Sequence, residues 1–216
     1  MCTVIVRTGH PLTLMGVRDE FADRPWEGPG EHWPDHPGVV GGLDLKAGGT
    51  WLAVDPTARR VAALLNGRGR EAPETTKISR GGLPLLAVTT GDLPELDLTR
   101  YDPFHLVLAD LTRTRLFSWD GERLGTTELP EGTSMIVNTG LDPANERTAA
   151  FQPRFAGDTD WRELITGTPS ADPGALIIRH ELPDGRVFAT LSVTLLTLTP
   201  EGVTYEFTDM TADQDG

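Results

Sequence analysis

The first twenty residues decide the fold of this chain: MCTVIVRTGHPLTLMGVRDE (residues 1–20). Residues 2–8 are mostly β-branched and apolar, Gly9-His10-Pro11 has the composition of a turn, and residues 12–17 are again typical of a strand. The charged run Arg18-Asp19-Glu20 is expected to close this second strand. The pattern therefore predicts a β-hairpin whose second strand returns towards the start of the chain.

The length and composition are those of a folded domain. The chain has 216 residues, of which 38% are hydrophobic and 24% charged, which allows a real core and argues against disorder. No internal repeat or linker divides it, so residues 1–216 are predicted to form a single domain. No apolar run approaches the ~20 residues that cross a bilayer, which predicts no membrane insertion. Arg7, His10 and Pro11 interrupt the apolar start, which argues against a signal peptide.

The charge and the cysteine count exclude several classes of function. A net charge of −13 repels phosphate backbones and anionic lipids, so nucleic-acid and membrane-surface binding are not expected. The single cysteine rules out an internal disulfide and a multi-cysteine zinc site, which agrees with a cytoplasmic location. No cofactor is predicted, and the composition leaves the oligomeric state open.

Short strands outnumber helices along the rest of the chain, which predicts an α+β fold. The segment 22–37 is rich in proline and glycine and is expected to lack regular structure. Strands are predicted at residues 39–42, 50–54, 60–66, 105–111, 114–120, 122–129, 134–138, 176–182, 186–198 and 203–207, and helices at 80–88, 143–155 and 159–164.

Cys2 is the focal residue for chemistry. Because cysteine is a small second residue, Met1 is expected to be removed, which leaves a thiol and a free α-amine on the same residue. An α-amine with a pKa of roughly 7.7–8.0 can act as general base for that thiol near neutral pH. The alternative interpretation is a buried cysteine in a strand with no chemical role.

Arg18 is the expected partner of Cys2, because the hairpin returns it to the same end of the sheet. A guanidinium near the sulfur would favour the thiolate. Asp19 and Glu20 would hold the arginine or accept a hydrogen bond from the α-ammonium. An ordinary ion pair at the surface end of a strand explains the same residues equally well.

Five segments carry a family resemblance: MCTVIV (1–6), VRDEFADRP (17–25), GGTWLAV (48–54), AALLN (62–66) and SRGGL (79–83). Their order and content resemble the NRDE family, also known as the transport and Golgi organisation group. The signature of that family is Asn-Arg-Asp-Glu with a following Arg-Pro, then Gly-Gly-Thr-Trp, a strand ending in Asn, and Arg-Gly. The resemblance covers about the first 90 residues well and the remainder weakly.

The resemblance implies a fold and a set of site residues. The family resembles N-terminal-nucleophile hydrolases, which implies a four-layer αββα sandwich of two mainly antiparallel sheets. The opening is also similar to cysteine-type members that cleave amides, with Cys2 as nucleophile and Arg18 at the end of the second strand. Asn66 and Asn138 then correspond to the amide side chains that flank the nucleophile, one of them an oxyanion donor. The alternative interpretation of either asparagine is an ordinary turn residue at a strand end, which explains Asn138 as well as the functional one does.

Two departures from the family pattern bear on catalysis. Val17 stands where the family has its leading asparagine, so one polar group beside Arg18 is missing. Near the C-terminus the family pattern Gly-Thr-Arg-Ser-Ser corresponds to residues 188–193, FATLSV, which contain no arginine.

Two functions remain from the sequence. The first is a Cys2-dependent amidohydrolase-like activity on a small acyl compound, an amide or a thioester. The second, implied by the family's association with haem trafficking and lipid homeostasis, is a non-enzymatic carrier of a hydrophobic ligand such as haem or an acyl-coenzyme A. Haem ligands would come from Cys2, His10, His32 and His36. No other metal is expected, because the HWPDH cluster at 32–36 supplies only two histidines between prolines.

Overall fold

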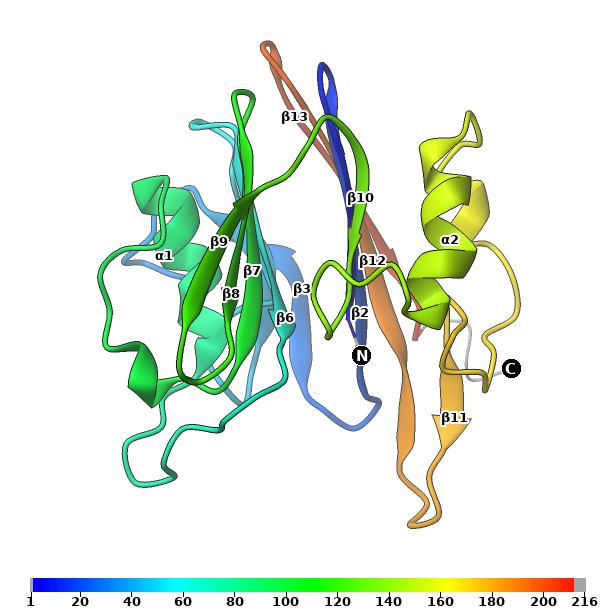
Figure 1. The fold of residues 1–216 in the computed structure, drawn as a ribbon, viewed down its shortest axis with the longest axis horizontal. Helices are drawn as coiled ribbons and strands as arrows, with labels where there is room; N and C mark the ends of the chain where they lie inside the picture. Colours follow the sequence, from blue (N-terminus) through cyan, green and yellow to red (C-terminus); the bar gives the residue numbers. More distant parts are fainter. Residues whose placement is uncertain (1, 212–216) are drawn as a thin grey trace.

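The protein is a four-layer sandwich in which two antiparallel β-sheets face each other and each carries a helix on its outer side (Figure 1). The computed structural model describes residues 2–211. The order of layers is α1, the seven-stranded sheet, the six-stranded sheet and α2 (Figure 1). The prediction of an α+β sandwich of antiparallel sheets is confirmed.

The six-stranded sheet contains the N-terminal hairpin at its centre. Its order is β10-β1-β2-β12-β11. β11 and β13 pair with different parts of β12, β11 with residues 187–189 and β13 with residues 192–199. Thr3 lies opposite Val17, so the start of β1 and the end of β2 are neighbours, as the hairpin predicted. The strands are β1 (Thr3–Thr8), β2 (Leu12–Phe21), β10 (Gly132–Ile136), β11 (Arg179–Glu181), β12 (Val187–Thr199) and β13 (Gly202–Asp209).

The seven-stranded sheet is a meander in chain order, β3 to β9. Each strand pairs with the next one in sequence. Short turns join β5 to β6, β7 to β8 and β8 to β9, whereas the long segment 67–103, which contains α1, joins β6 to β7. The strands are β3 (Trp26–Gly30), β4 (Val40–Asp44), β5 (Leu52–Asp55), β6 (Arg60–Asn66), β7 (Phe104–Ala109), β8 (Thr114–Trp119) and β9 (Leu124–Glu128).

The helices are short. α1 (Leu83–Thr90) follows a single 3₁₀ turn, η1 (Arg80–Gly82), and ends at Gly91, whose φ of 75° suits a glycine C-cap. α2 (Glu146–Ala156) begins at Asn145, whose side chain accepts from two backbone amides of the first turn. Further 3₁₀ turns are η2 (Leu98–Arg100) and η3 (Glu163–Ile165). Among residues 2–211, no helix has the length and apolar character that crossing a membrane requires.

Strand alternation divides the core into layers. Even-numbered residues of β1 and β2, such as Val4 and Leu14, pack between the two sheets. Odd-numbered residues, such as Ile5 and Met15, pack under α2. A third cluster lies between α1 and the outer face of the seven-stranded sheet. This alternation decides which side chains of the N-terminal hairpin face the space between the sheets.

Four local predictions were wrong. β2 does not close at the charged run but continues to Phe21, because β12 pairs along its whole length. The proline-rich segment contains β3, an edge strand whose register shifts before Pro29, a position where a missing N–H is tolerated. The predicted helix at 159–164 is only the turn η3. The strand predicted at 134–138 ends at Ile136, and Asn138 lies in the following turn.

Candidate active site

Cys2 and Arg18 share the face of the hairpin that looks towards the seven-stranded sheet. Both occupy even positions, in line with Val4 and Leu14, and Cys2 packs against the core between the sheets. The sequence prediction that the hairpin brings Arg18 to the same end as Cys2 agrees with the register of β1 and β2.

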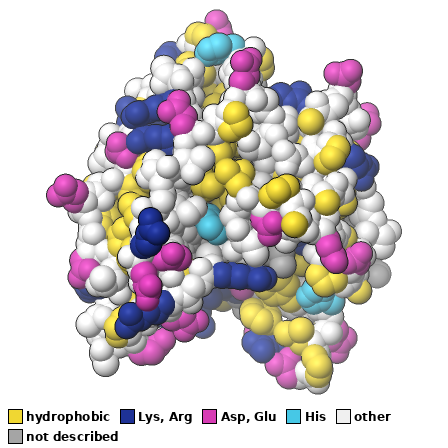
Figure 2. All heavy atoms as spheres, in the orientation of Figure 1, with side chains coloured by type: hydrophobic (Ala, Val, Ile, Leu, Met, Phe, Trp, Pro, Cys, Tyr) yellow, Lys and Arg dark blue, Asp and Glu magenta, His cyan; other side chains and the backbone are white. Residues whose placement is uncertain are grey.

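Cys2 opens into a cleft of about 480 Å³ between the two sheets. Arg18 and Trp51 line it close to the thiol, Asn66 and Asn138 line one side, and Arg80 belongs to its rim. Figure 2 shows the molecule hollowed at its lower edge, with Lys and Arg side chains bordering the hollow. A cleft of this volume accommodates a small organic molecule.

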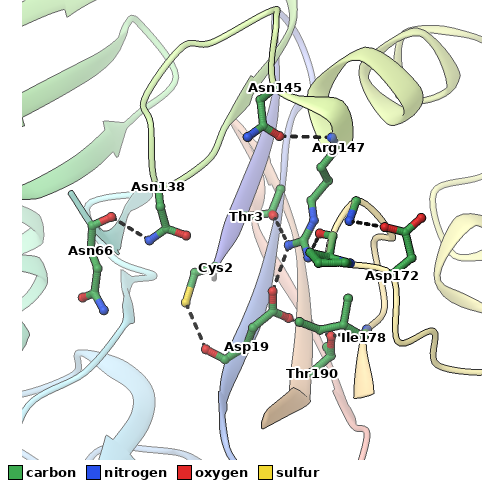
Figure 3. Close-up of polar contacts among 12 residues, drawn as sticks. Cys2, Thr3, Asp19, Asn66, Asn138, Asn145, Arg147, Asp172, Ile178 and Thr190 are labelled. Carbon is green, nitrogen blue, oxygen red and sulfur yellow. Dashed lines mark hydrogen bonds and ion pairs between the residues drawn. The ribbon is translucent and has the colours of Figure 1, made fainter. Parts of the chain in front are cut away.

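The Cys2 thiol is half-buried and neutral in character. Its Sγ donates to the backbone carbonyl of Asp19 at 3.7 Å, a weak contact that fixes the sulfur beside β2 (Figure 3). Burial raises the pKa of the Cys2 thiol and the Asp19 carboxylate adds to the rise, while the nearby Arg18 lowers it by a smaller amount. The sulfur therefore requires a base to become a nucleophile.

Arg18 is a buried guanidinium held by aromatic rings. It is 4% exposed, and its Cζ lies 4.1 Å from the Trp51 ring centroid and 5.6 Å from that of Trp26. Burial lowers the pKa of Arg18, and its Nη1 has no hydrogen-bond partner among residues 2–211. Cation–π contacts therefore orient a charge that still has hydrogen-bonding capacity towards the cleft.

Asp19 does not hold Arg18, contrary to one sequence expectation. Adjacent residues of a strand point to opposite faces, so the Asp19 carboxylate lies on the side of α2 (Figure 3). There it accepts from Arg147 Nη1 at 2.8 Å and from Thr190 Oγ1 at 2.7 Å. The same Arg147 nitrogen donates to Thr3 Oγ1 at 2.9 Å. Glu20 instead lies 4.0 Å from the guanidinium of Arg24.

Arg147 supplies a buried guanidinium in a chain that lacks the C-terminal arginine of the family pattern. It is 1% exposed, lies in the first turn of α2, and also donates to the Pro173 carbonyl at 3.1 Å. Thr190, in the stretch that lacks the arginine, contributes its hydroxyl to the same cluster. The structure thus places an arginine behind β1 and β2 from a different element.

The two asparagines meet across the cleft. Asn138 Nδ2 donates to the backbone carbonyl of Asn66 at 2.6 Å, which links the turn after β10 to the end of β6 (Figure 3). The Asn138 Oδ1 is buried without a partner among the described residues. The Asn66 side chain is exposed and lines the cleft. Of the two amides, that of Asn66 is therefore the one available to a ligand.

The rim is fixed by contact between two glycine-containing loops. A Cβ on Gly49 would lie 2.4 Å from the carbonyl carbon of Gly81, and Thr50 N donates to the Gly81 carbonyl at 2.9 Å. The close approach of the two backbones therefore explains why the GGTW and SRGG motifs have glycine at positions 49 and 81. Arg80, next to this contact, donates through Nη1 to the Pro103 carbonyl at 2.6 Å.

Sequence reasoning missed several of these residues. Arg80 lies inside the SRGGL motif, and its place in that motif could have identified it as a candidate site residue. No local sequence pattern indicates Arg147, because its partners Asp19 and Thr3 are 128 and 144 residues away in sequence. His105, which contacts Ser118 Oγ at 2.9 Å and lies against Gly140 beside the Asn138 turn, was likewise not singled out.

The candidate haem ligands are not assembled. His10 lies at the turn of the hairpin and lines a different cavity from Cys2. His32 contacts the Gly28 carbonyl, and His36 contacts Thr89. Within residues 2–211, no group of three or more His, Cys, Asp or Glu side chains is placed to hold a metal ion. Met1, whose removal the nucleophile hypothesis requires, lies outside the described residues.

Comparison with known proteins agrees with the motifs. Curated proteins give no match to the chain. The family model described as Transport and Golgi organisation 2 matches residues 1–166, which include the hairpin, both glycine loops and both asparagines. The chain belongs to the Transport and Golgi organisation 2 family.

Proposed function

We propose that this protein is a Cys2-dependent amidohydrolase that acts on a small acyl compound, an amide or a thioester. The observation that carries the proposal is the position of Cys2 Sγ in the cleft between the sheets, on the same face as the Arg18 guanidinium. The αββα layers and the cysteine at the start of a central strand are those expected of an N-terminal-nucleophile hydrolase.

Chemistry begins with the removal of Met1, which gives Cys2 a free α-amine. The α-amine takes the thiol proton while Sγ attacks the carbonyl carbon, and the carbonyl electrons move to oxygen. Collapse of this oxyanion breaks the C–N bond, and the amine leaves with the proton held by the α-ammonium. Water then cleaves the thioester and returns a proton to sulfur. The raised pKa of the Cys2 thiol fits a nucleophile that is deprotonated only during attack.

Three other residues support this chemistry in distinct ways. Arg18 favours negative charge on sulfur, in line with its lowering effect on the pKa of Cys2. The exposed amide of Asn66 donates to the oxyanion, and Asn138 positions it through the 2.6 Å bond to the Asn66 carbonyl. Asp19 contributes through its backbone carbonyl, which contacts Sγ, while its carboxylate fixes β2 from behind through Arg147.

A carrier of an acyl-coenzyme A is the second candidate. It is favoured by one observation: Arg68 and Arg80 line the cleft, and basic side chains suit a ligand that bears phosphates. A haem carrier has less support, because His10, His32 and His36 do not share a cavity with Cys2.

The test is the intact mass of the purified protein before and after treatment with para-nitrophenyl acetate. We expect the mass without Met1 and a single acetyl adduct, because the chain has one cysteine. Turnover of para-nitroacetanilide should accompany the adduct, and Cys2→Ala should abolish both.

The matched control inserts a lysine between Met1 and Cys2. This variant keeps the thiol, blocks methionine removal, and should lose turnover because Cys2 no longer carries the α-amine. A protein that retains Met1 and whose thiol does not react would overturn the enzymatic proposal and favour the carrier.

A further inference from the structure

The cleft is basic although the protein is strongly acidic. Four arginines and three carboxylates line it, in a chain whose net charge is −13. The carboxylates are already engaged: Asp44 pairs with Arg24 at 2.7 Å, Glu20 lies 4.0 Å from the same guanidinium, and Asp19 pairs with Arg147. The remaining cations that line the cleft form no salt bridge among residues 2–211: Arg18, Arg68 and Arg80.

Arg68 and Arg80 stand where two cavities join. A second cavity of about 390 Å³ shares Asn66, Arg68 and Arg80 with the cleft that contains Cys2. Arg80 is held by the Pro103 carbonyl and by the loop contact at Gly81, so its backbone and one guanidinium nitrogen are fixed. Arg68 is exposed and free to turn towards a ligand. Glu71 and Asp102 also line the second cavity, where Asp102 pairs with Lys77 at 2.9 Å, but neither carboxylate lines the cleft that contains Cys2. On the side of that cleft, two guanidinium groups at one junction form a site for an oxyanion.

The opposite wall of the cleft is aromatic. Phe21 and Phe188 line it from β2 and β12, with ring centroids 5.3 Å apart in an edge-to-face pair. His180 stacks on Phe188 and Arg186 covers Phe21, which supports the pair from outside the cleft. An apolar or aromatic group fits against this wall better than a charged one.

We infer that the ligand of this cleft carries an oxyanion, a carboxylate or a phosphate, held by Arg68 and Arg80, and an apolar group that packs on Phe21 and Phe188. This inference deepens the proposed function and rests on it only in placing the scissile carbonyl at Cys2. It adds the substrate class: acyl amides with an anionic substituent, rather than neutral amides.

A matched series of compounds tests the inference. The probes are para-acetamidobenzoate, para-acetamidobenzamide and para-acetamidophenyl phosphate, which share the acetamide and the ring and differ in the charged group. Their affinities for the full-length Cys2→Ala protein are measured by calorimetry, so that binding is read without turnover. We expect the benzoate or the phosphate to bind at least about tenfold more tightly than the benzamide. The stronger of the two identifies which oxyanion the site takes.

The variants separate the site from general electrostatics. Arg68→Met, at an exposed position, should reduce the preference for the anion to near unity, and Arg80→Lys should reduce it partly. Arg70→Met is the control, because Arg70 carries the same charge two residues away, pairs with Glu122 at 3.7 Å and lines neither cavity. It should leave the preference unchanged.

The outcomes distinguish this inference from the proposed function. Equal affinity for the three probes, or an equal loss of preference in Arg70→Met, overturns the anion site even if neutral amides are hydrolysed. A clear anion preference that depends on Arg68 supports the site even if the wild-type protein hydrolyses none of the probes.

Discussion

Arg18 and Arg147 are both buried, at 4% and 1% exposure, on opposite faces of the strand pair β1–β2. Arg147 is matched by the Asp19 carboxylate and also donates to Thr3 and Pro173. Arg18 has two tryptophan rings and no carboxylate partner among the described residues. One arginine has a buried carboxylate as its partner, and the other keeps hydrogen-bonding capacity for a ligand that enters the cleft.

The difference assigns separate tasks to the two faces of one sheet. The face under α2 holds β1 and β2 in register through a buried ion pair. The face towards the cleft displays Cys2 and a charge that is oriented but not neutralised. Substitutions on the two faces should therefore affect different measurements.

Arg147→Met should have the largest effect on stability. It removes the guanidinium that bonds the Asp19 carboxylate, whose side chain is 0% exposed and lies beside Thr190. Removal of one partner of a buried pair costs about 3–5 kcal/mol in the free energy of unfolding. Urea denaturation followed by tryptophan fluorescence measures the loss. The double variant Asp19→Asn/Arg147→Met should recover part of it, and a single variant as stable as wild type would contradict the comparison.

Arg18→Met should affect reactivity more than folding. The lost cation–π contact costs on the order of 1–2 kcal/mol, but removal of a buried charge without an ion pair offsets it, so the free energy of unfolding should change little. Because Arg18 lowers the pKa of the Cys2 thiol, its loss should move the pH midpoint of Cys2 alkylation upward. In the wild type that midpoint should already lie above the ordinary value of 9.0, since burial raises it. The measurement is the rate of Cys2 alkylation by iodoacetamide as a function of pH. A midpoint that is the same in Arg18→Met and in the wild type would show that Arg18 does not affect the pKa of the thiol.

Arg162→Met should have the smallest effect on stability and reactivity, and it serves as the reference for Arg147→Met and Arg18→Met. Arg162 bonds Glu206 and Asp160 at the surface, with its side chain 55% exposed, where solvent screens the interaction. The urea midpoint and the alkylation profile should both stay within experimental error. A loss of stability comparable with that of Arg147→Met would mean that burial does not decide how much these ion pairs contribute to the free energy of unfolding.

Local patterns predicted the hairpin, the individual strands from β4 to β9 and the return of Arg18 to the same end of the sheet as Cys2. These features depend on residues close in sequence, where turn chemistry and alternation suffice. Strand alternation also separates Arg18 from Asp19, because adjacent residues of a strand face opposite sides of the sheet.

The non-local contacts were not predictable from one sequence. The length of β2 depends on pairing with β12, about 170 residues away, and the partner of Asp19 comes from α2. β3 forms despite Pro29 because it lies at a sheet edge, which only the assembled topology reveals. The single-domain organisation and the catalytic roles of Cys2 and Asn66 stay predictions.

The backbone contact between Gly49 and Gly81 has a consequence for protein engineering. The rim of the cleft is held there by main chain, and the side chains of Ser79 and Arg80 add a bond from Gly81 N to Ser79 Oγ at 3.1 Å and one from Arg80 to the Pro103 carbonyl. Position 68, which is exposed and lines the cleft, can therefore be randomised in a library while both glycines, Ser79 and Arg80 are kept. Such a library would sample new ligand preferences on a rim whose path is unchanged.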